Sequence, residues 1–140
     1  MIALVLAILW RRWGILALTA AAVVVADLAA AGLKDVFGVE RPSSRYAAPK
    51  PLVAAPHDGS FPSGHAATSF ACALVLATAA PRLAVPFLLL ATAIAFSRVY
   101  VGVHYPLDVL GGAVLGLGVA TALLLLAGAR RRSPRGSPSG

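Results

Sequence analysis

The sequence has 140 residues, of which 59% are apolar and only 12% are charged. Soluble domains carry about 25% charged residues, so this composition excludes an ordinary water-soluble globule and favours a membrane protein. The formal net charge of +7 does not indicate nucleic-acid binding, because the basic residues form no continuous face. The single cysteine, Cys72, excludes an intramolecular disulfide and a cysteine-rich zinc site. We expect it to be a buried, small apolar residue.

Four apolar stretches rich in Ala, Leu, Val and Gly approach or reach the roughly 20 residues that a helix needs to cross a bilayer. They cover residues 13–33, 63–80, 83–96 and 107–127. We expect the third to extend through Val103, with Arg98 facing protein. None of them alternates polar and apolar residues, so helices are favoured over barrel strands. The predicted fold class is all-α, a polytopic transmembrane helical bundle.

The remaining stretches are shorter or polar. Residues 1–9 are apolar, but nine helical residues span only about 13 Å, half a bilayer. They are expected to form an interfacial segment or the remnant of a longer spanning helix. Residues 42–61 hold four of the ten prolines and most of the loop polarity, which predicts an extramembrane loop. Residues 130–140 contain only Arg, Ser, Pro and Gly. We therefore divide the chain into a membrane domain, 1–129, and a disordered basic cytoplasmic tail, 130–140.

Lysine and arginine positions predict the orientation. With four crossings, seven of these charges lie on one side of the membrane: Arg11, Arg12, Arg82, Arg130, Arg131, Arg132 and Arg135. Five lie on the other side: Lys34, Arg41, Arg45, Lys50 and Arg98. The positive-inside rule assigns the larger group to the cytoplasm, so the polar loop is expected to face outward.

Three polar clusters come to the outer face in this arrangement. They are Lys34 with Arg41-Pro42, then Pro62-Ser63-Gly64-His65, then Ser97-Arg98 followed by His104 and Asp108. Lys34, Arg41 and Arg98 supply three cations, two of which can bind phosphate oxygens in bidentate fashion. Ser63 and Gly64 open a helix, where free backbone N–H groups and the helix dipole favour an anion.

Two histidines add reactive groups to these anion-binding residues. Asp108 lies four residues after His104, and a carboxylate that accepts one ring N–H leaves the other ring nitrogen free as a nucleophile. His65 can then protonate the leaving oxygen as a general acid. The pattern predicts phosphoryl transfer through a phosphohistidine, with cations and backbone donors stabilising the developing charge.

The spacing of the three clusters resembles the tripartite signature of the type 2 phosphatidic acid phosphatase (PAP2) superfamily, which includes membrane lipid phosphatases, soluble acid phosphatases and vanadium haloperoxidases. The resemblance covers residues 34–108 by motif. It implies that His104 is the nucleophile, that Asp108 orients it, and that His65 is the acid for the leaving group and later the base for water. The phosphoryl oxygens would be bound by Lys34, Arg41, Ser63, the backbone at Gly64, and Arg98. The resemblance implies no metal and no cofactor.

The chain departs from this family at its N-terminal end. Membrane members usually have six spanning helices with the signature on the last four, so residues 1–9 resemble the end of the second helix. Three interpretations stay open: the short form folds alone, it forms a homodimer that covers the exposed surface, or the start site has been assigned too late.

The resemblance and the orientation together imply a lipid phosphatase of the bacterial plasma membrane with an outward-facing site. We favour polyprenyl (undecaprenyl) diphosphate as the substrate, because an outward site suits recycling of a carrier lipid for the cell wall. Phosphatidic acid, phosphatidylglycerol phosphate and transfer to an acceptor other than water are the alternatives. A non-catalytic protein that binds anionic lipid is the rival of a different class.

Simpler interpretations exist for several of these residues. Taken alone, Ser63 fits a helix N-cap and Asp108 fits a favourable first-turn carboxylate, while Arg98 fits a side chain that reaches to the interface. Gly112 and Gly116 form a small-xxx-small pattern that predicts close helix packing. Ordinary loop polarity is the favoured interpretation of four loop residues: Arg45, Lys50, His57 and Asp58. The less favoured alternatives are a role in substrate entry for His57 and Asp58, and contact with an anionic headgroup for Arg45 and Lys50.

Overall fold

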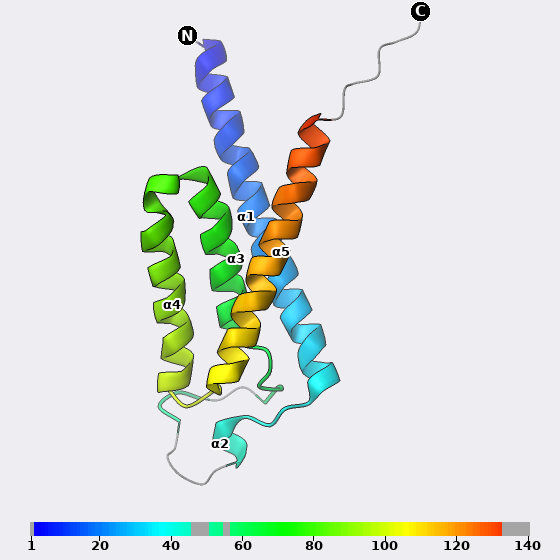
Figure 1. The fold of residues 1–140 in the computed structure, drawn as a ribbon, viewed down its shortest axis with the longest axis vertical. Helices are drawn as coiled ribbons and strands as arrows, with labels where there is room; N and C mark the ends of the chain where they lie inside the picture. Colours follow the sequence, from blue (N-terminus) through cyan, green and yellow to red (C-terminus); the bar gives the residue numbers. More distant parts are fainter. Residues whose placement is uncertain (1, 46–50, 55–56, 133–140) are drawn as a thin grey trace, which may run out of the picture.

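The computed structural model describes residues 2–45, 51–54 and 57–132, and helices account for most of them (Figure 1). In chain order they are α1 (Ile2–Phe37), α2 (Pro42–Arg45), α3 (Gly64–Ala79), the 3-10 turn η1 (Pro81–Leu83), α4 (Ala84–Tyr100) and α5 (Pro106–Arg132). The described residues contain no strand, so the predicted all-α fold class is confirmed.

The first helix is longer than expected. The sequence predicts a separate apolar segment at residues 1–9 and a spanning helix from residue 13, whereas α1 runs without a break from Ile2 to Phe37. No proline lies in this range, and the two arginines at 11 and 12 are good helix formers. Gly14 alone costs a helix only about 1 kcal/mol, so the two apolar stretches join.

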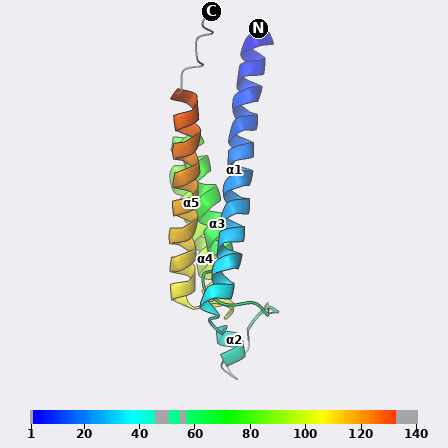
Figure 2. The same cartoon turned by 90° about the vertical axis from the view of Figure 1, so that its right-hand side faces the viewer.

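Within the part of the chain that the structure describes, three segments are long and apolar enough to cross a membrane: Trp13–Arg45, Pro81–Tyr100 and Pro106–Arg130. The fourth expected span becomes α3, which has 16 residues and a length of about 24 Å. It is short because Ser63 caps its start and Pro81 opens the next turn. It packs against α1, α4 and α5 (Figures 1 and 2). The described residues thus hold four apolar helices in the predicted order, but the prediction that all four are full spans is wrong for α3.

Two predicted boundaries are wrong by a few residues. The third span ends at Tyr100 rather than Val103, because Gly102 adopts a positive φ of 78°. The last helix continues to Arg132, so residues 130–132 of the predicted tail are helical; alanine and arginine favour a helix, and positive charge suits its C-terminus. Residues 133–140 of that tail lie outside the described residues.

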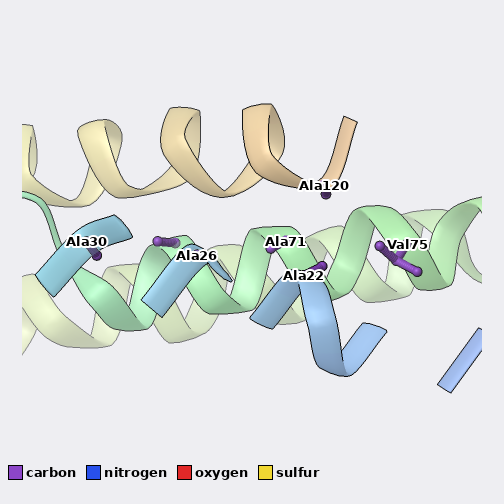
Figure 3. Close-up of a cluster of buried hydrophobic side chains, with 7 residues drawn as sticks. Ala22, Ala26, Ala30, Ala71, Val75 and Ala120 are labelled. Atoms are coloured by element: carbon purple, nitrogen blue, oxygen red, sulfur yellow. The ribbon is translucent and has the colours of Figure 1, made fainter. Parts of the chain in front are cut away.

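The core is built from small side chains, which let the helices approach closely (Figure 3). Its members on α1, α3 and α5 are Ala22, Ala26, Ala30, Ala67, Ala71, Val75 and Ala120. Many large apolar side chains point outward instead, among them Leu89, Phe96 and Val114. Lipid tails give no hydrophobic driving force between helices, so close packing of small residues is the expected source of stability.

Two glycines on α5 have no side chain to separate the helices, so the backbone of α5 packs directly against the backbone at the start of α3. A Cβ atom on Gly112 would lie 2.4 Å from the carbonyl oxygen of Ser63, and one on Gly116 would lie 2.1 Å from that of Ala67. The predicted packing role of this pair is confirmed. The contact also fixes the beginning of α3 beside the beginning of α5, where two of the polar clusters are located.

Candidate active site

The three polar clusters meet at one end of the bundle, the end that carries α2 in Figure 1. There the C-terminal ends of α1 and α4 lie beside the N-terminal ends of α3 and α5. A cavity of about 530 Å³ opens between them. It is lined by Asp27, Lys34, Arg41, Val53, Ala54, Asp58, Gly64, His65, Thr68, Arg98, Val103 and His104. Six of the eight predicted site residues belong to this lining; the other two, Ser63 and Asp108, are buried beside it.

The end of α1 positions the first cluster. Lys34 lies in its last turn, and Gly38, with a φ of 56°, ends the helix while donating its N–H to the Lys34 carbonyl at 2.9 Å. Glycine adopts this left-handed conformation without steric cost. The chain then reverses, and Arg41 reaches the cavity, where only 3% of it is exposed.

The end of α4 positions the third cluster through a Schellman motif. The N–H of Gly102 donates to the Val99 carbonyl at 3.0 Å, and the N–H of Val103 donates to the Arg98 carbonyl at 3.3 Å. Gly102 occupies the position that requires a positive φ. This turn carries the chain from Arg98, on the helix, to His104, which lies four residues beyond its end.

Ser63 caps α3. Its hydroxyl accepts the Ala66 N–H at 3.5 Å, and its own N–H donates to the Asp108 carbonyl at 2.9 Å. Ser63 is fully buried and does not line the cavity. The structure thus supports the simpler N-cap interpretation, and a contribution of Ser63 to phosphate binding stays a prediction. Gly64 and His65 follow in the first turn and do line the cavity.

His104 and Asp108 form the expected pair. The ring Nδ1 lies 3.4 Å from Asp108 Oδ2, and both residues are buried. The carboxylate only accepts, so Nδ1 carries the proton. The same Oδ2 accepts the Tyr105 N–H at 2.7 Å and the hydroxyl proton of Ser60. Asp108 is therefore fixed by three donors, of which sequence reasoning identified only the histidine.

The second ring nitrogen of His104 faces Arg41. Nε2 lies 3.2 Å from Arg41 Nη1, and since a guanidinium only donates, Nε2 is the acceptor. Burial first, and then the charge of Arg41, lower the pKa of His104 to about 4, although Asp108 acts in the opposite direction. The imidazole is neutral at pH 7 and keeps a lone pair on Nε2, as a nucleophile requires.

Asp58 lies between two of the cations. Its carboxylate forms ion pairs with Lys34 Nζ and, at 2.7 Å, with Arg41 Nη2. Partial burial raises the pKa of Asp58, but hydrogen bonds and charges from Lys34 and Arg41 outweigh it and lower this pKa to about 2. Ordinary loop polarity, the favoured interpretation of Asp58 from the sequence, is therefore wrong.

Sequence reasoning also missed Asp27 and Ser60. Asp27 lines the cavity and lies seven residues, two helical turns, before Lys34, so the two share a face of α1. A carboxylate inside an apolar helix at this spacing is a signal that could have identified it. Ser60 is fully buried, but nothing in the sequence distinguishes it from the other serines of its loop.

An apolar groove of about 260 Å³ adjoins the polar cavity, and Thr68 lines both. The groove runs between α1, α3 and α4; its lining is Val23, Thr68, Ser69, Cys72, Ala73, Leu76, Phe87, Leu90, Ala91 and Ile94. Cys72 is half-buried in this groove rather than fully buried as expected. A charged cavity and an apolar groove thus meet at one shared residue, Thr68.

The profile of the PAP2 superfamily matches residues 2–132, nearly the whole chain. The chain belongs to the PAP2 superfamily. The resemblance drawn from the three clusters is thereby confirmed at the level of the family, while the roles of the individual cavity residues stay predictions.

Several named proteins are similar to this chain over part of their length. An undecaprenyl-diphosphatase of Sulfolobus acidocaldarius is 44% identical over 62 residues, covering 44% of this chain and 30% of the relative. The undecaprenyl-diphosphatase BcrC of Bacillus subtilis is 35% identical over 80 residues, covering 51% and 42%. A decaprenylphosphoryl-5-phosphoribose phosphatase of Mycobacterium tuberculosis is 40% identical over 78 residues, covering 56% and 43%. The chain therefore matches less than half the length of each of these three.

A solved structure shares the fold. It is a transmembrane PAP2 type phosphatidylglycerolphosphate phosphatase from Bacillus subtilis, with a TM-score of 0.59 and 28% sequence identity. The similarity covers 85% of this chain and 61% of the solved one. The helical arrangement around the cavity is thus a PAP2 arrangement.

Proposed function

We propose that this PAP2 chain is a membrane lipid phosphatase that hydrolyses a lipid diphosphate or phosphomonoester through a phosphohistidine. The observation that carries the proposal is that the cationic, histidine-bearing cavity and the apolar groove are neighbours, with Thr68 in the lining of both. The cavity suits a phosphate group, and the groove suits the hydrocarbon to which the phosphate is attached. A soluble phosphate ester has no hydrocarbon chain that could occupy the groove.

The proposed reaction has two displacements at phosphorus. His104 Nε2 attacks, the P–N bond forms, and the bond from phosphorus to the lipid oxygen breaks while His65 gives that oxygen a proton. Water then attacks the phosphorus of the phosphohistidine while His65 takes a proton from the water; the new P–O bond forms, the P–N bond breaks, His104 is regenerated and inorganic phosphate leaves. Asp108 holds the imidazole and stabilises its positive charge after the first attack.

Charge stabilisation is assigned to residues of this chain rather than to a metal. Lys34, Arg41 and Arg98 line the cavity and would bind the non-bridging oxygens, together with backbone N–H groups at the start of α3 near Gly64. On this basis we propose that hydrolysis is metal-independent.

Polyprenyl diphosphate, the carrier lipid of cell-wall synthesis, is the substrate we favour. Two of the relatives compared above are named undecaprenyl-diphosphatases, and the charge distribution predicts that the cavity faces the extracytoplasmic side of a bacterial plasma membrane. A polyprenyl-linked phosphosugar, phosphatidic acid or phosphatidylglycerol phosphate would be handled by the same residues. Phosphoryl transfer to another acceptor would also use them.

The homodimer stays a prediction. The outward-facing leucines and phenylalanines that a second copy would cover fit lipid equally well. The non-catalytic lipid-binding alternative is disfavoured because His104, Asp108 and His65 are all present at the cavity.

The substrate proposal is tested by measuring phosphate release from four lipids with the purified protein in detergent. The lipids are polyprenyl diphosphate, polyprenyl phosphate, phosphatidic acid and phosphatidylglycerol phosphate. We expect the highest kcat/KM with polyprenyl diphosphate. Hydrolysis of phosphatidic acid with none of polyprenyl diphosphate would reject this substrate; lipid binding by a folded protein without any hydrolysis would favour the non-catalytic alternative.

A further inference from the structure

We propose that Asp58 is a positioning residue of the phosphate site: it holds Lys34 and Arg41 until the substrate binds and then releases them to phosphate oxygens. The inference rests on the proposed phosphatase function, because it takes the cavity to be the phosphate site. It gives a role to a loop carboxylate for which loop polarity was the simplest interpretation.

The hydrogen bonds of Arg41 are the first argument. Nε donates to the Asp58 carbonyl at 3.0 Å; Nη1 donates to the Val103 carbonyl at 3.0 Å and to His104 Nε2 at 3.2 Å. Nη2 donates to Asp58 Oδ1 at 2.7 Å and to the Gly59 carbonyl at 3.3 Å. A guanidinium has five N–H donors, and all five are used. Arg41 can bind a phosphate oxygen only if one of these acceptors leaves.

The position of the Asp58 carboxylate identifies the acceptor that leaves. Oδ2 contacts Lys34 and Oδ1 contacts Arg41, so the two oxygens bridge the two cations as two oxygens of a phosphate would. The cations are largely enclosed, with side-chain exposures of 13% for Lys34 and 3% for Arg41, whereas the Asp58 side chain is 48% exposed. Since the carboxylate can be rehydrated most easily, it is the partner that moves.

Exchange of the Asp58 carboxylate for phosphate oxygens, as the partner of Arg41, also affects the proposed nucleophile, His104. In the unliganded site the lone pair of His104 Nε2 accepts a hydrogen bond from Arg41 Nη1, so it is not free to attack. Phosphate oxygens that take the donors of Arg41 compete with this contact as well as with Asp58. Binding of the phosphate would thereby release the nitrogen that attacks it.

The charge of the cavity predicts the effect of removing the carboxylate. Three cations, Lys34, Arg41 and Arg98, face two carboxylates, Asp27 and Asp58. In Asp58→Asn, three cations face one carboxylate, and no anion competes for Lys34 and Arg41. We expect inorganic phosphate to bind about fivefold more tightly, the size of effect typical of a partly exposed ion pair. The KM for the lipid should fall by a similar factor, with no increase in kcat.

The test is isothermal titration of inorganic phosphate into the purified full chain in detergent, which requires no turnover. Glu40→Gln is the matched control: it removes the same charge from an exposed residue near the same loop, and among the described residues Glu40 forms no ion pair with Lys34 or Arg41. Its phosphate affinity should stay within twofold of the unmodified protein. Asp58→Glu, which keeps a carboxylate, should also stay near the unmodified value, and Asp58→Ala provides a second neutral variant if the Asn variant does not fold.

The outcomes separate the inference from the function on which it rests. Tighter phosphate binding by the neutral variants, absent in Glu40→Gln, supports the exchange. Equal or weaker binding by a folded neutral variant overturns it, since Asp58 would then only support the loop, while the proposed phosphatase function would survive. Failure of every protein, including the unmodified one, to bind phosphate would overturn both.

Discussion

At the level of a single residue, the surroundings of His104 are those that the proposed nucleophile requires. Its Nδ1 donates to Asp108 and its Nε2 faces Arg41. Burial and the guanidinium both disfavour the imidazolium ion. The neutral form is therefore retained far into the acidic range, and the lone pair lies on the nitrogen that faces the cavity rather than on the one that faces Asp108.

This arrangement predicts that the His104 side chain takes up a proton at a lower pH than an ordinary histidine. The pKa of His104 is lowered to about 4, so its side chain should stay neutral as the pH falls through 6 and 5 and take up a proton only near pH 4. Side-chain NMR of the three histidines in the detergent-solubilised protein measures the midpoint, with His104→Gln to assign the signal. Arg41→Gln should raise the midpoint, because a positive neighbour is removed. A midpoint near the ordinary 6.5 for His104 would contradict the account.

Ser60 is predicted to act through Asp108. Ser60→Ala removes one of the three donors to the Asp108 carboxylate, and leaving a buried carboxylate short of a donor costs about 1–3 kcal/mol. We expect kcat to fall about tenfold with little change in KM, measured by phosphate release. Ser44→Ala, at an exposed serine of α2, is the control and should retain full activity. A Ser60→Ala variant with unchanged kcat would show that the two other donors suffice.

The reactive residues could be predicted because their types and spacing are visible in the sequence, whereas their partners could not. Lys34, Arg41, His65 and His104 each carry a charge or a reactive ring in an otherwise apolar chain. Asp58 and Ser60 lie in a loop where polar residues are ordinary, and only the folded loop reveals that one contacts the cations and the other contacts Asp108.

At the scale of the helices, α5 and α3 are held at a distance that only glycine permits. Gly116→Ala places a Cβ 2.1 Å from the Ala67 carbonyl oxygen, so the helices must separate. Overpacking of this kind costs about 1–3 kcal/mol, and we expect the midpoint of thermal unfolding, followed by circular dichroism in detergent, to fall accordingly.

The same helix provides the control for this prediction. Gly118 is exposed, and nothing lies within 4 Å of the position that its Cβ would occupy. Gly118→Ala should leave the midpoint unchanged or raise it, because alanine is the better helix former by about 1 kcal/mol. Equal destabilisation by both substitutions would mean that the α3–α5 contact does not depend on Gly116.

The presence of each long helix could be predicted from the length of its apolar stretch, but the residues at which the helices begin and end could not. The merger of residues 1–9 with the next span and the end of α4 at Tyr100 depend on propensity and on one left-handed glycine. Gly102 looks like any other glycine in the sequence. Its φ of 78° ends α4 and directs the chain to His104, so the third cluster depends on it for its geometry.

Across the whole molecule, the helices place small residues inside, large apolar residues outside and the buried polar residues at one end. This is the distribution expected of a bundle in lipid, where packing and not burial of apolar surface holds the helices together. The reactive end can meet a lipid phosphate while the lipid tail stays among the outward-facing apolar side chains.

The central claim is that His104 carries the phosphoryl group without the help of a metal. The most direct test is phosphate release from polyprenyl diphosphate by the purified protein with EDTA present, compared with a folded His104→Ala variant. We expect turnover that EDTA leaves unchanged and that the variant loses by at least about 10³-fold. Turnover that EDTA abolishes, or that persists in His104→Ala, would contradict this claim.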